Sequence, residues 1–416
     1  MATVPAIASS VIVVSRHRPD ALLRAIAGIR QLDHPCVELI VVADPAACAL
    51  VRGLGIPVKL LPFDEANIAA ARNLGLALAA GDVVAFLDDD AVPEPTWLSR
   101  LVAPFADPQV AASGGFVRGR NGISFQWRAR EVDAVGQDHT LRVDPAAVSL
   151  LPGKPGRAVK TQGTNCAFRT QALRAIGGVD PAFRFYLDEA DVNMRLAALG
   201  GLTAIVPLAQ VHHGYAQSRQ RRADRVPLSL HDIGASTVVF LRRHAHEGDW
   251  PGALTTLRAD QRARALRHMV TGGIEPRDVA RLLATLEQGM AEGRMRPLAA
   301  CPPVTAAAPP FMPLTGTGPR NGLIIAGRVW QRKALLAQAQ RAVAQGHIVT
   351  VICLAPTARA HRHSFTASGV WLQQGGLFGR ADRREPLLRL TTFAARVARE
   401  CRRLSPLRPL SRLPHL

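Results

Sequence analysis

The chain has 416 residues, of which 48% are hydrophobic and 20% are charged. This composition excludes an intrinsically disordered protein and provides enough apolar material for roughly two or three globular domains. Lys and Arg together number 51 against 32 Asp and Glu, so the formal net charge is +19. Such a charge favours partners that carry phosphate, namely nucleotides, nucleic acid or an anionic membrane surface.

The positive charge is unevenly distributed along the chain. Residues 1–245 contain 26 basic and 22 acidic residues, whereas residues 246–416 contain 25 and 10. Nearly all of the excess is arginine, as codon bias alone would produce. No apolar run reaches the ~18 residues that a membrane span requires. The six scattered cysteines form no CxxC pair. Together these features predict a reduced, cytoplasmic protein whose membrane contact, at the inner face of the cell membrane, is peripheral.

Short apolar runs alternate with helical patterns through the first 210 residues. The expected strands are residues 11–14, 38–43, 58–61, 83–87 and 202–206, and the expected helices include residues 20–32 and 68–80. This alternation predicts an α/β sheet with parallel strands covered by helices. Ligands of such sheets bind at the carboxyl ends of the strands, so the residues that follow each strand are the candidates for a site.

Polar residues stand at several of these strand ends. Asp44 follows the second strand, and three consecutive carboxylates, Asp88, Asp89 and Asp90, follow the run 83–87. A second acidic cluster spans residues 188–191, and the last strand leads to the histidine pair 212–213. Carboxylates and histidines therefore recur where an active site is expected.

The second half of the chain divides by composition. We expect a catalytic α/β domain over residues 1–215 and a basic helical extension over 216–296. Residues 297–319 contain seven prolines and the run Ala306-Ala307-Ala308, which is typical of a linker. Residues 320–416 then form a small, basic α/β region with strands near 322–326 and 348–354 and a helix near 333–345.

Three adjacent carboxylates are costly unless a cation or hydrogen-bond donors neutralise them. Alternate residues at a strand end project to the same side, so Asp88 and Asp90 share a face and Asp89 points elsewhere. Hard carboxylate oxygens suit Mg²⁺ or Mn²⁺, which also bridge the phosphates of a nucleotide diphosphate. The alternative for a D-x-D string by itself is a solvated acidic loop or a helix cap.

Six blocks in a fixed order narrow this choice. They are residues 11–14, 39–44, 67–75, 81–93, 163–169 and 177–180, and they include Ala71-Arg72-Asn73, Asp88-Asp89-Asp90 and Gly163-Thr164-Asn165. This series resembles the family 2 glycosyltransferases of the GT-A fold over about residues 8–245. The resemblance implies a Rossmann-like mixed sheet flanked by helices and an inverting, DxD-containing enzyme.

The resemblance also implies a donor site. It places Asp44 at the nucleotide base or ribose, Arg72 near the nucleotide and Asp88 at the DxD motif, with Asp89 beside it. Asn165 is expected to line the donor-sugar or acceptor pocket. For Arg72 the structural alternative is a helix-face arginine paired with a nearby carboxylate.

The metal and the general base follow from the same comparison. Asp88 and Asp90 are the expected metal ligands, and His213, with His212 as second choice, completes the set, because imidazole suits Mn²⁺ better than Mg²⁺. Glu189 falls at the position of the base that takes the acceptor proton, and Asp191 and Asp188 are the alternatives. These acids would otherwise cap the helix that follows them.

The predicted function is metal-dependent transfer of a sugar, with inversion, from a nucleotide-diphosphate donor to a saccharide or polyprenyl-linked acceptor, in the synthesis of bacterial cell-surface glycans. We expect Arg219, Arg221, Arg222 and Arg225 to clamp the diphosphate or to lie on anionic lipid. The basic helices of residues 380–412 are expected to attach the protein to a membrane surface or to dock a partner enzyme; the alternative is a solvated tail. Nucleic acid is not an expected partner.

Two other functions are open to this sequence. One is a noncatalytic scaffold, or a protein that binds nucleic acid or membrane, built on an inactive glycosyltransferase core. The other is a nucleotidylyltransferase, which usually needs a loop rich in glycine and arginine soon after the first strand. Residues 15–19 contain no glycine, which disfavours it.

Overall fold

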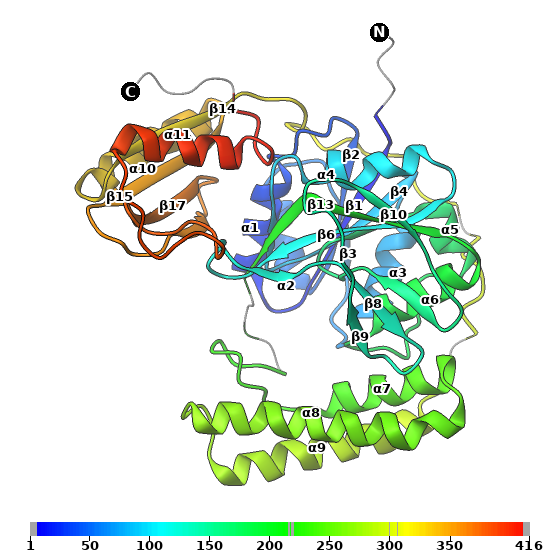
Figure 1. Cartoon of the computed structure of the whole chain (residues 1–416). Helices are drawn as coiled ribbons and strands as arrows, with labels where there is room; N and C mark the ends of the chain where they lie inside the picture. Colours follow the sequence, from blue (N-terminus) through cyan, green and yellow to red (C-terminus); the bar gives the residue numbers. More distant parts are fainter. Residues whose placement is uncertain (1–5, 215–216, 218–219, 299, 306, 411–416) are drawn as a thin grey trace.

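The computed structural model describes residues 6–214, 217, 220–298, 300–305 and 307–410. It contains a large mixed sheet, a layer of three long helices and a smaller C-terminal sheet (Figure 1). The α/β class expected from the sequence, with a mixed sheet flanked by helices, is confirmed.

The N-terminal half of the large sheet is parallel and runs in the order β4-β1-β2-β3. Strands β1, β2 and β4 are almost wholly buried, as expected for strands that helices cover on both faces, whereas the edge strand β3 is partly exposed. The elements are β1 (Ser9–Ser15), α1 (Pro19–Ile29), β2 (Val37–Ala43), α2 (Pro45–Arg52), β3 (Lys59–Pro62), α3 (Ile68–Leu78) and β4 (Val83–Asp88).

The second half of the sheet continues from β4 in the order β12-β6-β13-β10 and includes antiparallel pairs. Two short strands, β5 and β7, pair with β13 and β6. The elements are β5 (Ala91–Pro93), α4 (Trp97–Val102), β6 (Val110–Arg118), β7 (Phe125–Trp127), β10 (Ser149–Pro152), β12 (Cys166–Arg169), α5 (Thr170–Ala175), α6 (Asp188–Ala198) and β13 (Leu202–His213). A separate three-stranded sheet contains β8 (Arg130–Asp133), β9 (Asp138–Thr140) and β11 (Arg157–Lys160).

The basic helical extension forms three helices, α7 (His231–His244), α8 (Trp250–Val270) and α9 (Pro276–Met295). Its apolar core includes Val238, Leu282 and Leu286. Helices α7 and α9 approach so closely that a Cβ atom at Gly289 would lie 1.9 Å from the His231 carbonyl oxygen. Glycine is therefore required there, because any side chain would push the two helices apart.

The proline-rich segment 297–319 contains no helix or strand among its described residues, but it packs against the large sheet. The Leu314 amide donates to the Val37 carbonyl at 2.7 Å, and the Leu314 side chain joins the core beneath β2. The ion pair between Lys59 and Glu38 at 2.8 Å is buried in the same region, where the Met312 amide donates to Glu38. The segment is therefore bound along the domain; the domain boundaries stay a prediction.

The C-terminal region forms a four-stranded sheet in the order β14-β15-β17-β16. The predicted βαβ unit is present as β14 (Gly322–Arg328), α10 (Arg332–Ala344) and β15 (Ile348–Ala355), followed by β16 (Arg362–Phe365), β17 (Trp371–Gly376) and α11 (Phe393–Leu404). As far as the structure describes the chain, no helix combines the length and hydropathy needed to cross a bilayer.

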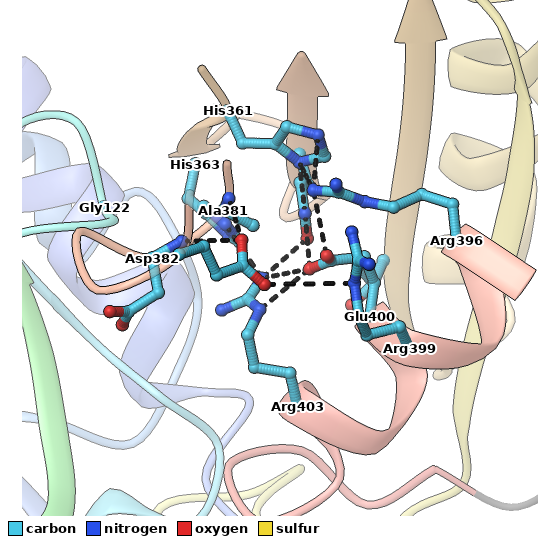
Figure 2. Close-up of polar contacts among 12 residues, drawn as sticks. Gly122, His361, His363, Ala381, Asp382, Arg396, Arg399, Glu400 and Arg403 are labelled. Carbon is cyan, nitrogen blue, oxygen red and sulfur yellow. Dashed lines mark hydrogen bonds and ion pairs between the residues drawn. The ribbon is translucent and has the colours of Figure 1, made fainter. Parts of the chain in front are cut away.

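Beside its apolar core, this region contains a buried cluster of polar side chains (Figure 2). Arg396 and Glu400 of α11 are fully buried and paired at 3.0 Å, and Gln373 of β17 donates to Glu400 at 2.8 Å. Burial and the Arg396 charge lower the pKa of His361 to about 4, so the ring is neutral. Part of the basic charge assigned to a membrane surface or a solvated tail is thus internal, because Arg396 and Arg408 are buried.

Candidate functional site

The acidic turn after β4 separates its three carboxylates. Asp88 ends β4 and Asp90 precedes β5, and both belong to one cluster. Asp89 is fully buried; it accepts a hydrogen bond from Ser15 Oγ at 2.7 Å and pairs with Arg18 at 2.7 Å. Burial raises the pKa of Asp89 to about 7, although Arg18 opposes the shift. These contacts tie Asp89 to the end of β1 and to Arg18, and a role of Asp89 at the donor stays a prediction.

His213 reaches the acidic turn because the end of β13 pairs with β5. In this antiparallel pair His213 lies opposite Ala91, and the Gly214 amide donates to the Asp90 carbonyl at 2.7 Å. The His213 Nε2 atom lies 3.0 Å from Asp90 Oδ1 and 4.0 Å from Asp88 Oδ2. Pairing of strands that are remote in sequence thus assembles three predicted ligands.

The chemistry of these three side chains fits a divalent cation. Ligand atoms of Asp88, Asp90 and His213 all lie within 4.8 Å of one another. His213 Nδ1 lies 3.0 Å from Gln126 Oε1; that oxygen only accepts, so Nδ1 carries the proton. The Nε2 atom then faces carboxylate oxygens, an arrangement that needs a proton or a cation there. Burial would lower the pKa of His213, but Asp90 and Asp88 raise it. A carboxylate and imidazole set of this kind suits Mn²⁺.

The second-choice ligand, His212, is not part of this cluster. Successive residues of a strand point to opposite faces, and His212 Nε2 lies 2.7 Å from Glu94 Oε1. Its ring packs against Trp371 of the C-terminal region, with ring centroids 5.3 Å apart. The expectation that His212 serves as a ligand is therefore corrected by the direction of its side chain.

Arg72 links the acidic turn to the second acidic cluster. The guanidinium is buried; it pairs with Asp188, lies 3.4 Å from Asp88 and donates to the Gly163 carbonyl at 3.0 Å. Burial alone would lower the pKa of Arg72, but Asp188 and Asp88 raise it. Asp188 is accordingly a buried ion-pair partner, so its contacts differ from those expected of a base that faces the acceptor.

Glu189 has the properties expected of a general base. It is half-buried at the start of α6. Burial and the neighbouring Asp188 raise the pKa of Glu189 to about 7, against the opposing charges of Lys160 and Arg72. A base with a pKa near the working pH combines availability with proton affinity.

The backbone just before Glu189 is strained. Tyr186 and Leu187 have φ angles of 75° and 65°, in the left-handed region that residues with side chains rarely adopt. Leu187 is buried against Phe183 and Phe240, which holds the turn in place. Such strain is typical of functional sites, where surrounding packing fixes an otherwise costly conformation.

Three further predicted residues have structural contacts. Asp191 is fully buried and pairs with Arg195 at 2.7 Å and His244 at 2.9 Å, which joins α6 to α7. Asn165 is also fully buried; its amide accepts from Trp97 and donates to the carbonyls of residues 116 and 209. The polar atoms of both side chains are thus engaged in contacts within the fold, and their roles as base and as pocket lining stay predictions.

Asp44 lies where the sequence placed it, at the carboxyl end of β2. It caps α2 by accepting from the Ala47 amide at 3.1 Å, and it accepts from the His17 amide at 2.8 Å. Burial would raise the pKa of Asp44, but these two hydrogen bonds and the His17 charge lower it. The carboxylate is therefore ionised at the edge of the sheet.

The expected arginine clamp is only partly described. Arg219 lies outside the described residues. Arg222 pairs with Asp224 at 2.7 Å and donates to the Gly273 carbonyl, so it turns toward the helical extension. Arg221 lies near His213, because its charge opposes the rise in the pKa of that ring. Arg225 lies in the turn that follows, where its amide donates to the Arg222 carbonyl at 3.0 Å.

Two residues near the predicted ligands and base, Gln126 and Lys160, were not predicted from the sequence. Gln126 of β7 fixes the His213 ring, and Lys160 of β11 supplies a positive charge near Glu189 while donating to Asp138 at 2.8 Å. Gln126 carries no motif that would distinguish it. Lys160 had one available signal, since it is one of four lysines in an arginine-rich chain.

A cavity of about 320 Å³ opens beside this site. Its lining includes Gln126, Arg128 and Arg130 on one side and Asp382 and Arg383 of the C-terminal region on the other. Arg130 pairs with Asp138, the residue that also holds Lys160. The lining of the cavity thus includes Gln126, the partner of His213, and Arg130, which shares Asp138 with Lys160. A cavity of about 440 Å³ near Arg174 and Val304 has none of these residues in its lining.

Known proteins resemble this chain mainly over its first half. The sequence model of glycosyl transferase family 2 matches residues 10–176. The succinoglycan biosynthesis protein ExoM of Rhizobium meliloti is 35% identical over 225 residues, which cover 50% of this chain and 67% of that protein. The pre-mycofactocin glycosyltransferase of Mycobacterium tuberculosis is 28% identical over 215 residues, which cover 50% of this chain and 42% of that protein.

Two further similarities are more distant. The O-antigen biosynthesis protein RfbC of Myxococcus xanthus is 27% identical over 323 residues, 63% of this chain and 24% of that protein. The chain thus spans less than half the length of the mycobacterial and myxobacterial relatives. A solved mannosyltransferase of Pyrobaculum calidifontis, in complex with GDP-Man and Mn²⁺, is 17% identical; the match covers 70% of this chain and 88% of that one, with a TM-score of 0.43. A similarity at that level carries no weight for function.

Proposed function

The chain belongs to glycosyl transferase family 2, and on this basis we propose that it is a metal-dependent, inverting enzyme. It transfers a sugar from a nucleotide-diphosphate donor to a saccharide or lipid-linked acceptor during synthesis of a cell-surface glycan. The observation that carries the proposal is the joint placement of Asp88, Asp90 and His213. The acids of an inactive core would have no reason to remain together in this way.

The cation site serves the leaving group. When bound, Mn²⁺ or Mg²⁺ neutralises charge that develops on the departing diphosphate. Asp88, Asp90 and His213 are the proposed ligands, and Gln126 orients the histidine. Arg72, paired with both Asp88 and Asp188, keeps the two acidic clusters in fixed relation. Asp44 is the proposed contact to the donor nucleoside.

Glu189 is the proposed general base. In the single displacement step the acceptor hydroxyl oxygen bonds to the anomeric carbon, the bond from that carbon to the diphosphate breaks, and the proton passes to the Glu189 carboxylate. The diphosphate leaves with the bonding electron pair. The raised pKa of Glu189 supports this role, because a stronger base takes the proton more readily.

The cavity beside Gln126 is the proposed acceptor site. Its position between the partner of His213 and the residues that hold Lys160 lets an acceptor approach both the donor and the base. The aromatic ring of Phe125 and the guanidinium groups of Arg128 and Arg383 line it. These groups are suited to a sugar ring that bears hydroxyl or anionic substituents.

A thermal-shift titration with UDP and GDP, each with Mn²⁺, Mg²⁺ or a chelator, tests the donor site. We expect one nucleotide to raise the melting temperature only when the cation is present, because ligands stabilise the folded state to which they bind. Asp90→Asn should abolish that shift. A nucleotide shift that survives both chelation and Asp90→Asn would contradict the proposed metal dependence.

A further inference from the structure

The C-terminal region reaches the metal-ligand residues through one buried arginine. We propose that Arg408 is a positioning residue, which acts through Glu94 and His212 to hold the strand pair that carries Asp90 and His213. We call this element, residues 90–94 and 210–214, the ligand strand pair. The inference rests on the proposed function, because it assigns Arg408 a part in the same metal site.

The ligand strand pair has a site end and an anchored end. At the site end, the Gly214 amide donates to the Asp90 carbonyl at 2.7 Å, and His213 lies opposite Ala91. At the other end, the Glu94 amide donates to the Gln210 carbonyl at 3.0 Å. Glu94 lies four positions after Asp90, which corresponds to roughly 13 Å of extended chain. A shift at Glu94 is therefore transmitted along a short, stiff element to the ligands.

Glu94 is the point of attachment. Its carboxylate is 1% exposed and receives both Arg408 Nε at 2.7 Å and Arg408 Nη2 at 2.9 Å. The same carboxylate lies 2.7 Å from His212 Nε2. Because His212 adjoins His213 and points to the other face of β13, one carboxylate ties both strands of the pair to the C-terminal region.

Arg408 is itself held in place. It follows α11, its Nη1 donates to Thr350 Oγ1 of β15 at 2.9 Å, and its guanidinium stacks on Trp371 at 4.1 Å. The Trp371 indole donates to Gln31 Oε1 at 3.0 Å, and its ring also packs against His212. The arginine is therefore fixed by the C-terminal sheet before it reaches Glu94.

The buried network of Figure 2 continues this attachment. Arg403 of α11 donates to His363 at 3.1 Å, and the His363 ring lies 6.4 Å from that of His212. The His363 amide donates to the Asn121 carbonyl, next to Gly122, where a Cβ atom would lie 2.4 Å from His363 Cβ. The C-terminal region thus packs closely against the catalytic half of the chain. This contact involves His212, which points to the face of β13 opposite His213.

Loss of Arg408 leaves Glu94 as a buried carboxylate without its cation. Such a group must move toward water or take up a proton, and either change releases the ligand strand pair. Groups that orient metal ligands commonly contribute about 10- to 100-fold to metal affinity. A role confined to holding the two regions together would instead change stability and leave the affinity for metal unaltered.

The test is direct titration of the full chain with Mn²⁺ alone, followed by electron paramagnetic resonance of the free ion. Arg408→Gln is compared with Arg100→Gln as a matched control. Arg100 also joins this segment to the catalytic half, by donating to the Pro406 carbonyl at 2.7 Å, but it makes no bond to Glu94. We expect Arg408→Gln to weaken Mn²⁺ binding at least about 10-fold, Arg408→Lys to have an intermediate effect, and Arg100→Gln to retain wild-type affinity.

Folded Arg408→Gln protein that binds Mn²⁺ as tightly as Arg100→Gln would overturn the inference. If Arg408→Gln does not fold, the double variant Glu94→Gln with Arg408→Gln replaces the ion pair by neutral amides. If this double variant binds Mn²⁺ as tightly as the wild type, the inference is overturned equally. Failure of the proposed metal site is distinguishable, because the wild-type chain would then bind no Mn²⁺ or Asp90→Asn would bind it unchanged.

Discussion

Glu189 lies where an ionised carboxylate is unfavourable, and the proposed role as general base gives a reason for this placement. The residue is half-buried next to Asp188, and its pKa is raised to about 7. These surroundings disfavour the ionised carboxylate, which is a cost for a glutamate without a chemical role. For a base that must accept a proton near neutral pH, the same surroundings raise proton affinity. The strained turn at Tyr186 and Leu187 fixes where this carboxyl group lies.

Replacement of Glu189 by Gln should lower kcat on the order of 10²- to 10⁴-fold, because the acceptor proton loses its base. In the wild-type enzyme, kcat should fall about tenfold per pH unit below about pH 7, where Glu189 becomes protonated. Steady-state transfer assays across pH measure both effects. A Gln variant with the wild-type rate and pH profile would contradict the assignment of the base.

The same variant has an expected effect on stability. The pKa of Glu189 is about 7 in the folded state and near its ordinary value of 4.5 in the unfolded state. The folded state therefore binds the proton more tightly, and its stability falls as the pH rises from 4.5 to 7. Glu189→Gln, which cannot ionise, should melt above the wild type at pH 8 and together with it near pH 4.5.

At the scale of elements, strand alternation decides the roles of the histidine pair. In β13, His213 faces the acidic turn and His212 faces the C-terminal region. The short strand β5 pairs with the end of β13, and β7 supplies Gln126. The proposed metal site thus depends on four strands, β4, β5, β7 and β13, whose order in the sheet differs from their order in the sequence.

Gln126→Leu should weaken Mn²⁺ binding about 10-fold or more, because the His213 ring loses the acceptor that fixes its Nδ1 proton and its orientation. Isothermal titration with Mn²⁺ measures the change. Gln137→Leu, in the turn between β8 and β9, is a control that leaves the His213 ring untouched. Equal affinities of the two variants would show that Gln126 does not orient the ligand.

At the scale of the whole molecule, the proline-rich segment 297–319, between the helices and the C-terminal sheet, packs along the catalytic half of the chain. Its composition is that of a linker, yet Leu314 is 3% exposed and belongs to the core beneath β2. The C-terminal region then docks through Arg408, Trp371 and Gln31. Arg408 and Arg396 therefore lie in the interior of the chain and not on a basic surface.

Leu314→Ala should reduce the free energy of unfolding by about 2–5 kcal/mol, as expected when a buried leucine is truncated. Leu298→Ala, in the same proline-rich segment but 38% exposed, should cost less than about 0.5 kcal/mol. Urea unfolding of both variants gives the comparison. If Leu314→Ala leaves the free energy of unfolding unchanged, the segment does not pack on the sheet and is a free linker.

Local sequence determined most of the elements and the positions of the motifs. The helices expected at 20–32 and 68–80 are found as α1 and α3, and the strand expected at 83–87 is β4, which ends at Asp88. Apolar periodicity fixes such elements, because each residue's burial follows from its neighbours in the chain. The DxD motif and His213 were identifiable for the same reason, since each directly ends a recognisable strand.

Only the tertiary structure decided which polar groups meet. Asp89, Asp191 and Asn165 are buried in the folded chain. The carboxylate of Glu94 contacts both His212 and Arg408, and Arg408 is 314 positions away in the sequence. No local pattern encodes such encounters, because they depend on strand order and on which charges find buried partners. The sequence thus determined the family and the +19 charge, and the packing decided that several of its arginines support the fold from within.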